Sequence, residues 1–361
     1  MKTREDVERM LREGETFHKE VLDELDLSEI DFGGTNFLET TMRGTKLVGA
    51  RLAEGAFSMC DFTGADLSGA TLKDSVFHKC VFNDARLDGA NFQKTAINES
   101  SFDGMKADGT DFSYTPWLQV SLKGVHLANA NLELASFVQA DFEGTSFAGV
   151  NLDRTTFMEI DLTSALDLGK AKFKTTTLFK NRIVGHSFRG ADLSLCQLME
   201  CELDGCDFTS AKLEQTNFGS SSLVGASFSD ADLKQALFPK ARLKDAKFVG
   251  ARMSQSVFME ADVTSADFSQ TKADLAVFAQ AICVGATFRD ADLTYGDFSH
   301  ADLTDADLRG TTLFRARLHA SKQDNTKFGP SKMAARGEDA ELLEAEGWWL
   351  KHRRERPNEE A

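Results

Sequence analysis

The sequence repeats a large apolar residue at every fifth position over most of its length. When positions are counted in fives from Leu27 to Leu162, and again from Leu168 to Phe328, 26 of the 29 phenylalanines fall on the counted positions. A small residue, most often alanine, stands two positions before most counted residues, and polar residues or glycine fill the other positions. A period of five matches neither the period of 2.0 of a strand nor the 3.6 of a helix. The repeat therefore predicts short extended segments separated by corners.

The spacing of phenylalanine predicts how many corners close one coil. Phe37, Phe57 and Phe77 recur at every twentieth position, and ten phenylalanines follow at intervals of ten from Phe208 to Phe298. Twenty residues therefore return the chain to the same face. Four faces of five residues make one square coil, and the counted residues form columns of like side chains inside it. We expect an all-β fold in which neighbouring coils pair as strands.

Several segments share the order of a small residue, Asp, Leu, and then two more polar residues or glycine, as in ADLSG, ADLTD and ADLRG. In this order the chain resembles the pentapeptide-repeat family over residues 22–328. The resemblance implies a right-handed quadrilateral β-helix. We expect this solenoid to carry short capping helices at its N- and C-terminal ends, because the ends of a solenoid expose unpaired strand edges.

One irregularity divides the repeat. The interval from Leu162 to Phe173 is eleven residues instead of ten, so the repeat slips by one position. The slip predicts a bulge, kink or short loop. The expected segments are an N-terminal capping helix over 1–21, a lower sub-rod over 22–162, the register shift over 163–187, an upper sub-rod over 188–328, and a C-terminal helix with a mobile tail over 329–361.

Both terminal segments carry helix signals. Thr3 and Asp6 have the spacing of a capping pair. Residues 338–350 place apolar side chains on one helical face, with Trp348 beside it. We expect the apolar face of this helix to cover the end of the solenoid, and Trp348 is either a residue of that cap or an anchor for a partner protein. The resemblance to the family also implies a homodimer through the helix. The candidate partner-binding residues are Leu342, Leu343, Trp348, Trp349 and Leu350.

The formal net charge of −16 disfavours direct binding to nucleic acid or to an anionic membrane. The N-terminus has no apolar signal region, and no stretch approaches the roughly 18 uninterrupted apolar residues of a membrane span. We therefore expect a cytoplasmic protein, or one exported without a cleaved signal.

No nucleotide-binding, hydrolase or metalloprotease motif is present in the sequence. A convex rod offers no cleft for paired carboxylates. We therefore expect no enzymatic activity, no catalytic residues and no cofactor. The aspartates recur at one turn position of the repeat, as at Asp61, Asp66, Asp232, Asp262, Asp292 and Asp302.

Five of the six cysteines occupy the small inward position of the repeat, and Cys283 occupies a counted position. Cys60 and Cys80 are one full coil apart and should stack on one face, at a separation that permits a disulfide, but buried free thiols are the favoured interpretation. A second group of cysteines, with one histidine, could in principle ligate zinc. Their side chains start from different faces of a wide square coil and would have to converge at one point, so we expect no metal there. This set is His186, Cys196, Cys201 and Cys206.

Two functions fit these features. The first is a protein-binding adaptor. The segments REGETFHKEVLDELDLSEIDF and ADLRGTTLFRARLHA resemble pentapeptide-repeat proteins of bacterial type VI secretion, which implies a secretion spike protein or effector as partner. The alternative is an acidic DNA mimic that binds DNA gyrase or topoisomerase IV, as some family members do. The chain departs from those members in its greater length and in the lysine and arginine on its faces.

Overall fold

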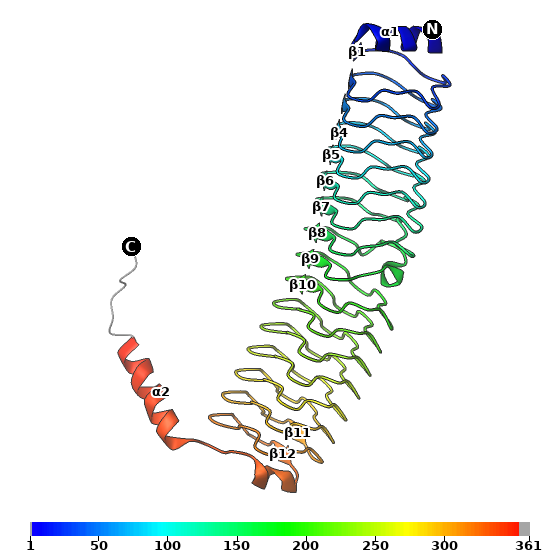
Figure 1. Ribbon diagram of the computed structural model, residues 1–361. Coiled ribbons are helices and arrows are strands. Elements are labelled where there is room, and N and C mark those ends of the chain that lie inside the picture. The colour runs from blue at the N-terminus through cyan, green and yellow to red at the C-terminus, as the bar shows by residue number, and fades with distance from the viewer. Residues whose placement is uncertain (1, 354–361) are drawn as a thin grey trace. The chain divides into compact units, whose positions relative to one another are not determined.

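The computed structural model describes the backbone of residues 2–353 and the side chains of residues 2–348. The chain divides into two compact units, one up to Asn217 and one from Phe218 onward. Each unit is a quadrilateral β-helix, which confirms the predicted fold class (Figure 1).

In the first unit, ten short strands stack in parallel on one face, in chain order. Phe37 pairs with Phe57 on this face. The other faces pair through single parallel bridges one coil apart, as Val21 does with Thr41. The strands are β1 (Phe17–His18), β2 (Asn36–Leu38), β3 (Ala56–Ser58), β4 (Val76–His78), β5 (Ala96–Asn98), β6 (Pro116–Leu118), β7 (Ser136–Val138), β8 (Thr156–Met158), β9 (Thr177–Phe179) and β10 (Gln197–Met199).

The second unit repeats the same coil mainly through single bridges, such as Ser222 with Arg242. A longer pairing lies near its end, where β11 (Asp307–Leu308) is parallel to β12 (Lys327–Phe328). The short helix η2 (Pro330–Ala334) follows.

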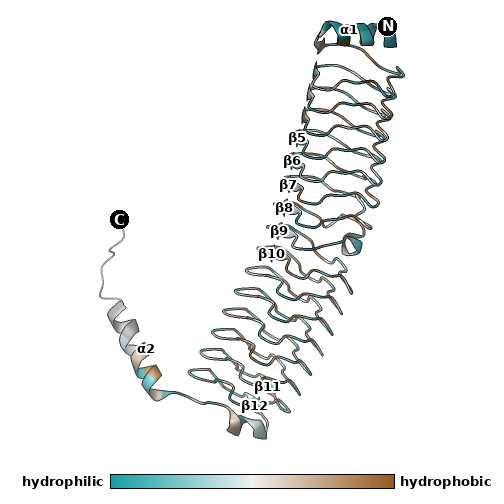
Figure 2. Cartoon of the chain, in the orientation of Figure 1, coloured by the Kyte–Doolittle hydropathy of each residue, from teal (hydrophilic) through white to brown (hydrophobic). Residues whose placement is uncertain are grey.

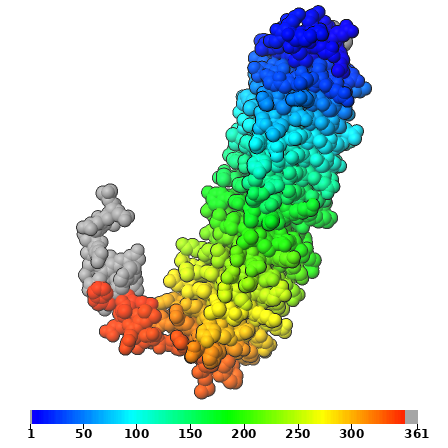
Figure 3. Space-filling model, viewed as in Figure 1, coloured from blue at the N-terminus to red at the C-terminus, as the bar shows by residue number. Residues whose placement is uncertain are grey.

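Columns of stacked rings fill the interior of each coil. In the second unit the rings of Phe238 and Phe258 lie 4.7 Å apart and within 6° of parallel. Phe248, from the neighbouring column, meets Phe238 edge to face at 5.9 Å and 88°. Both are favoured aromatic geometries. Over most of each unit, the counted residues and the small residues two positions before them are buried, and the other residues face outward, so hydropathy alternates along the coils (Figure 2). The coils of each unit close into a continuous surface (Figure 3).

Polar residues in the small inward position donate to main-chain carbonyl oxygens, in the first unit mostly on the preceding coil and at Ser256, Thr271 and Thr311 within the same coil. The hydroxyl of Thr45 donates to the carbonyl oxygen of Leu22 at 2.8 Å. In the same way, the hydroxyl of Thr95 donates to the carbonyl oxygen of Leu72 at 2.7 Å. Because a buried hydroxyl without a partner is destabilising, this bond explains why threonine and serine replace alanine there.

The register slip is a single inserted residue inside the first unit. Ser146 pairs with Leu166 at the regular interval, whereas Asn151 pairs with Lys172, which lies one position further along the chain than the repeat requires. The extra residue is taken up by the one-turn helix η1 (Leu168–Lys170). The expected shift over 163–187 thus takes the form of one short turn.

Glycine is required within η1. A Cβ on Gly169 would overlap the carbonyl oxygen of Ser187 on the next coil. Asn181 and His186, the unusual residues of the small inward position, bond to carbonyl oxygens of the coil before them, as threonine does elsewhere.

The N-terminal helix α1 (Arg4–Glu13) has the expected capping pair, in which Thr3 and Asp6 bond to each other's main-chain N–H. Val7 and Met10 are the buried residues of this helix. Strand pairing begins at Phe17, within the segment assigned to the N-terminal cap.

The C-terminal helix α2 (Ala340–Arg353) forms where expected, with Asp339 accepting the N–H of Leu342 at 3.0 Å. It differs from expectation in its packing, because Leu342 and Leu343 are 43% and 40% exposed. The last coil is instead paired by main chain, since the N–H of Arg336 donates to Ala316 at 2.7 Å. No helix in the described part of the chain has the length and apolar character needed to cross a membrane.

The aspartates that directly precede counted residues stabilise the turns by accepting hydrogen bonds from the turn residues. The carboxylate of Asp302 accepts the main-chain N–H of Thr304 at 3.1 Å and its hydroxyl at 2.6 Å, and the hydroxyl bond helps lower the pKa of Asp302. Hydrogen bonds from the Arg309 guanidinium lower the pKa of Asp307 to about 2.

The ring columns predict the effect of truncating one ring. Phe248→Ala should lower the free energy of unfolding of the second unit by about 3–5 kcal/mol, because a fully buried ring is lost from a packed stack. Phe314→Ala, at a residue that is 49% exposed, is the matched control and should cost less than about 1 kcal/mol. Urea unfolding followed by circular dichroism measures both, and equal midpoints would contradict the stacked core.

The Asp307 bonds predict a dependence of stability on pH. A carboxyl whose pKa is lowered by folding stabilises the protein above its unfolded pKa of about 3.9 and loses this contribution as the pH falls toward its folded value. Asp307→Asn should therefore lower the melting temperature at neutral pH and flatten its decline between about pH 4 and pH 2. Glu338→Gln, an exposed acidic position, is the control. If the melting temperatures of Asp307→Asn and wild type fall equally between pH 4 and pH 2, Asp307 does not contribute to this pH dependence.

Candidate functional site

The aspartates that recur in the sequence have a local role in the turns. Each accepts the main-chain N–H of the second residue after it, for example Asp61 from Thr63 at 2.9 Å and Asp262 from Thr264 at 3.0 Å. The same bond is made by Asp66, Asp232, Asp292 and Asp302.

Ion pairs between coils mix the charges on the outward faces. Arg182 lies between Asp161 at 3.3 Å and Glu202 at 3.2 Å, on the coils before and after it. In the second unit, Arg252 bonds to Asp232 at 2.9 Å. Such exposed pairs add little stability, but they place a cation beside carboxylates on these faces.

All six cysteines are buried free thiols. Cys60 and Cys80 each lie near the main-chain carbonyl oxygen of the preceding coil's counted residue, at 3.6 Å and 3.5 Å. Burial raises the pKa of Cys80, and it raises the pKa of Cys196, Cys201 and Cys206 to about 12 each. These thiols are therefore held in the protonated, unreactive form.

The residues considered as a zinc set bond separately to the main chain. His186 Nε2 lies 2.9 Å from the carbonyl oxygen of Leu162. Cys201 and Cys206 donate to different carbonyl oxygens, at 3.2 Å and 2.9 Å. The structure does not bring these side chains together with Cys196 as a ligand group.

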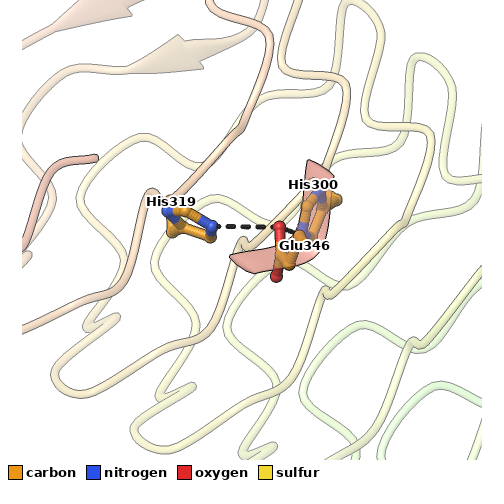
Figure 4. Close-up of side chains that lie close together, drawn as sticks. All are labelled: His300, His319 and Glu346. Atoms are coloured by element: carbon orange, nitrogen blue, oxygen red, sulfur yellow. Dashed lines mark hydrogen bonds and ion pairs between the residues drawn. The ribbon is translucent and has the colours of Figure 1, made fainter. Parts of the chain in front are cut away.

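A different group of potential ligands converges in the second unit. His300 and His319 lie on successive coils, and Glu346 reaches them from α2 (Figure 4). The Oε2 atom of Glu346 lies 3.2 Å from Nε2 of His300 and 3.4 Å from Nε2 of His319. His319 is only 2% exposed, and its Nδ1 accepts the N–H of Asp339 at 3.2 Å. Partial burial favours a raised pKa for Glu346, but the hydrogen bonds from the two histidines bring the net pKa below its usual value.

Sequence reasoning missed this group. The spacing of His300 and His319 is one residue short of a full coil, so the repeat itself places them on neighbouring rungs. That spacing was the available signal. The contribution of Glu346 follows no period, because α2 lies beyond the repeat.

The candidate partner-binding residues lie on different sides of α2. At 3.6 residues per turn, Leu342 and Leu343 lie about 40° and 60° from Glu346 around the helix, whereas Trp348 lies about 160° from it. Glu346 contacts the coils of the second unit, and Trp348, on the opposite side of the helix, is 62% exposed. The side chains of Trp349 and Leu350 lie outside the described residues.

A shallow groove crosses the outer surface of β1 to β4. The small side chains of Ala56 and Ser58 are part of its lining. It is lined by His18, Asn36, Leu38, Val76 and His78 among others.

The thiol burial predicts slow chemical modification. At about pH 8, Ellman's reagent should modify on average less than about one thiol per folded chain within an hour, because all six thiols are buried. All six should react at once in guanidinium chloride. Fast labelling of any cysteine in the folded protein would contradict its burial.

Sequence models of known families match most of the chain. The model of the pentapeptide repeat region matches residues 171–248. The model of eight pentapeptide repeats matches residues 21–64, 60–95, 121–158, 240–272 and 274–319. No curated protein matches the chain.

Solved structures also match the chain. HetL, a pentapeptide repeat protein involved in heterocyst differentiation regulation in the cyanobacterium Nostoc sp. strain PCC 7120, is 20% identical, with 79% of this chain and 97% of HetL covered and a TM-score of 0.20. QnrB1, a plasmid-mediated fluoroquinolone resistance protein, is 19% identical, with 55% and 96% covered and a TM-score of 0.31. At these identities and TM-scores, the matches carry no information about function.

Three observations therefore agree on the repeat: the period in the sequence, the buried columns inside the coils and the matches to the family models. The chain belongs to the pentapeptide-repeat family.

Proposed function

We propose that this chain is a non-catalytic protein-binding scaffold and that α2 engages its partner. The observation that carries the proposal is Trp348, which is 62% exposed on the side of α2 opposite Glu346. Exposed tryptophan on a helix is a frequent anchor in protein interfaces, because one side chain supplies a large apolar area with few rotatable bonds.

The construction of the coils supports a scaffold. The inward residues fill the interior, and the turn aspartates are bonded within their own turns. Outward side chains can therefore change without disturbing the core, as in other repeat proteins. The groove over β1 to β4 adds a second surface of mixed polar and apolar character.

The finer form of the proposal is an adaptor for bacterial type VI secretion, acting in the cytoplasm or after export without a cleaved signal. It rests on the resemblance of the opening segment and of the segment ADLRGTTLFRARLHA to proteins of that system. The partner in this case is a secretion spike protein or an effector. A second copy of this chain, joined through α2, is a further candidate partner.

An acidic mimic of DNA that binds gyrase or topoisomerase IV is the second candidate. The net charge of −16 favours it. The ion pairs between coils weigh against it, because cations such as Arg182 and Arg252 interrupt the rows of carboxylates. A DNA duplex presents an unbroken line of phosphates.

Affinity capture from the native host tests the proposal. The full chain with an N-terminal tag is compared with Trp348→Ala and with Met333→Ala, a control residue in η2 that is 94% exposed. We expect Trp348→Ala to lower recovery of the partner at least about tenfold, equivalent to about 1.4 kcal/mol, while Met333→Ala recovers it as wild type does.

Mass spectrometry of the recovered protein separates the candidates. A spike protein or effector supports the secretion adaptor, a gyrase or topoisomerase subunit supports the DNA mimic, and light scattering detects a second copy. The role of α2 is rejected if both variants recover the partner as wild type does.

A further inference from the structure

The group formed by His300, His319 and Glu346 joins parts of the second unit that lie apart in the sequence. The two imidazoles come from neighbouring coils and the carboxylate comes from α2. One potential ligand atom from each side chain lies within 4.8 Å of the other two. Imidazole nitrogen and carboxylate oxygen are both ordinary zinc ligands.

The spacing of the ligand atoms is close to that of a tetrahedral site. Zinc binds nitrogen and carboxylate oxygen at about 2.0–2.2 Å, which places neighbouring ligand atoms of a tetrahedron roughly 3.3–3.5 Å apart. Glu346 Oε2 lies 3.2 Å from Nε2 of His300 and 3.4 Å from Nε2 of His319. Two of the three edges therefore have nearly the required length.

We propose that His300, His319 and Glu346 bind a divalent transition metal ion, with zinc as the best match to this ligand set. His319 is buried, whereas the side chains of His300 and Glu346 are 39% and 34% exposed. The exposed side gives the ion a path of entry and leaves room for water as the fourth ligand. This inference goes beyond the proposed function, because neither the coils nor a partner on Trp348 requires a metal.

Metal binding to His319 would break a hydrogen bond from the residue that directly precedes α2. The N–H of Asp339 donates to Nδ1 of His319, which places the proton of a neutral His319 on Nε2, toward Glu346. A cation on Nε2 takes the place of that proton, and the ring then carries its proton on Nδ1. The bond from Asp339 is given up, so residues 337–339 should shift when the metal binds.

The ion would fasten α2 to the coils. In the structure, Glu346 of α2 contacts the coils through His300 and His319. Three metal bonds in place of these hydrogen bonds would hold the helix in one position. The metal would therefore restrain the helix that carries Trp348, although it does not touch that residue.

Calorimetric titration of the untagged full chain with zinc chloride tests the proposal, after treatment with a chelator. We expect one zinc ion per chain. His300→Ala and Glu346→Gln should each weaken binding at least about tenfold, because each removes one ligand. Glu344→Gln, an exposed glutamate on the same helix, is the matched control and should bind zinc as wild type does.

Cobalt(II) supplies a second measurement on the same proteins. A tetrahedral site gives an intense visible spectrum, which should be present in wild type and Glu344→Gln and lost in His300→Ala and Glu346→Gln. His319→Ala should lose it as well, with circular dichroism to check folding, since His319 is buried. The proposal is overturned if wild type takes up no zinc, or if the variants lacking His300 or Glu346 bind zinc as tightly as wild type.

Discussion

The structure depends on the stacking of like residues once per coil. Within each unit, counted side chains lie over their counterparts on the preceding coil, and main-chain hydrogen bonds join the same two coils. The two interactions require each other. Ring stacking at 4.7 Å matches the spacing of paired strands, about 4.7–4.9 Å, so neither the core nor the hydrogen bonds are strained by the other.

This arrangement separates the stable part of the molecule from the part that can acquire function. The inward positions are occupied by a narrow set of residues, and the aspartates are fixed in the turns. The two candidate binding features on which the proposals rest lie where the repeat ends. The exposed tryptophan and the histidine–glutamate group both involve α2, which follows the last coil.

The sequence predicted the coil, its four faces and the inward columns, because these follow from a period that any reader can count. It also predicted the N-terminal capping pair of Thr3 and Asp6, which is a local signal. It did not predict the packing of α2. Leu342 and Leu343 have the spacing of a buried face, yet they are partly exposed, because Arg336 and its neighbours already pair with the last coil. Glu346 could not be assigned to His300 and His319, since no repeat relates a terminal helix to the coils.

The inserted residue at η1 has a consequence for how such a chain can change length. Elsewhere a single added residue would turn an inward side chain outward on every following face. At this corner the surplus is absorbed locally, and the coils that follow keep their pattern. The corner at Leu168–Lys170 thus shows that a solenoid of this kind can lengthen by one residue at a turn while the coils before and after it keep their pairing.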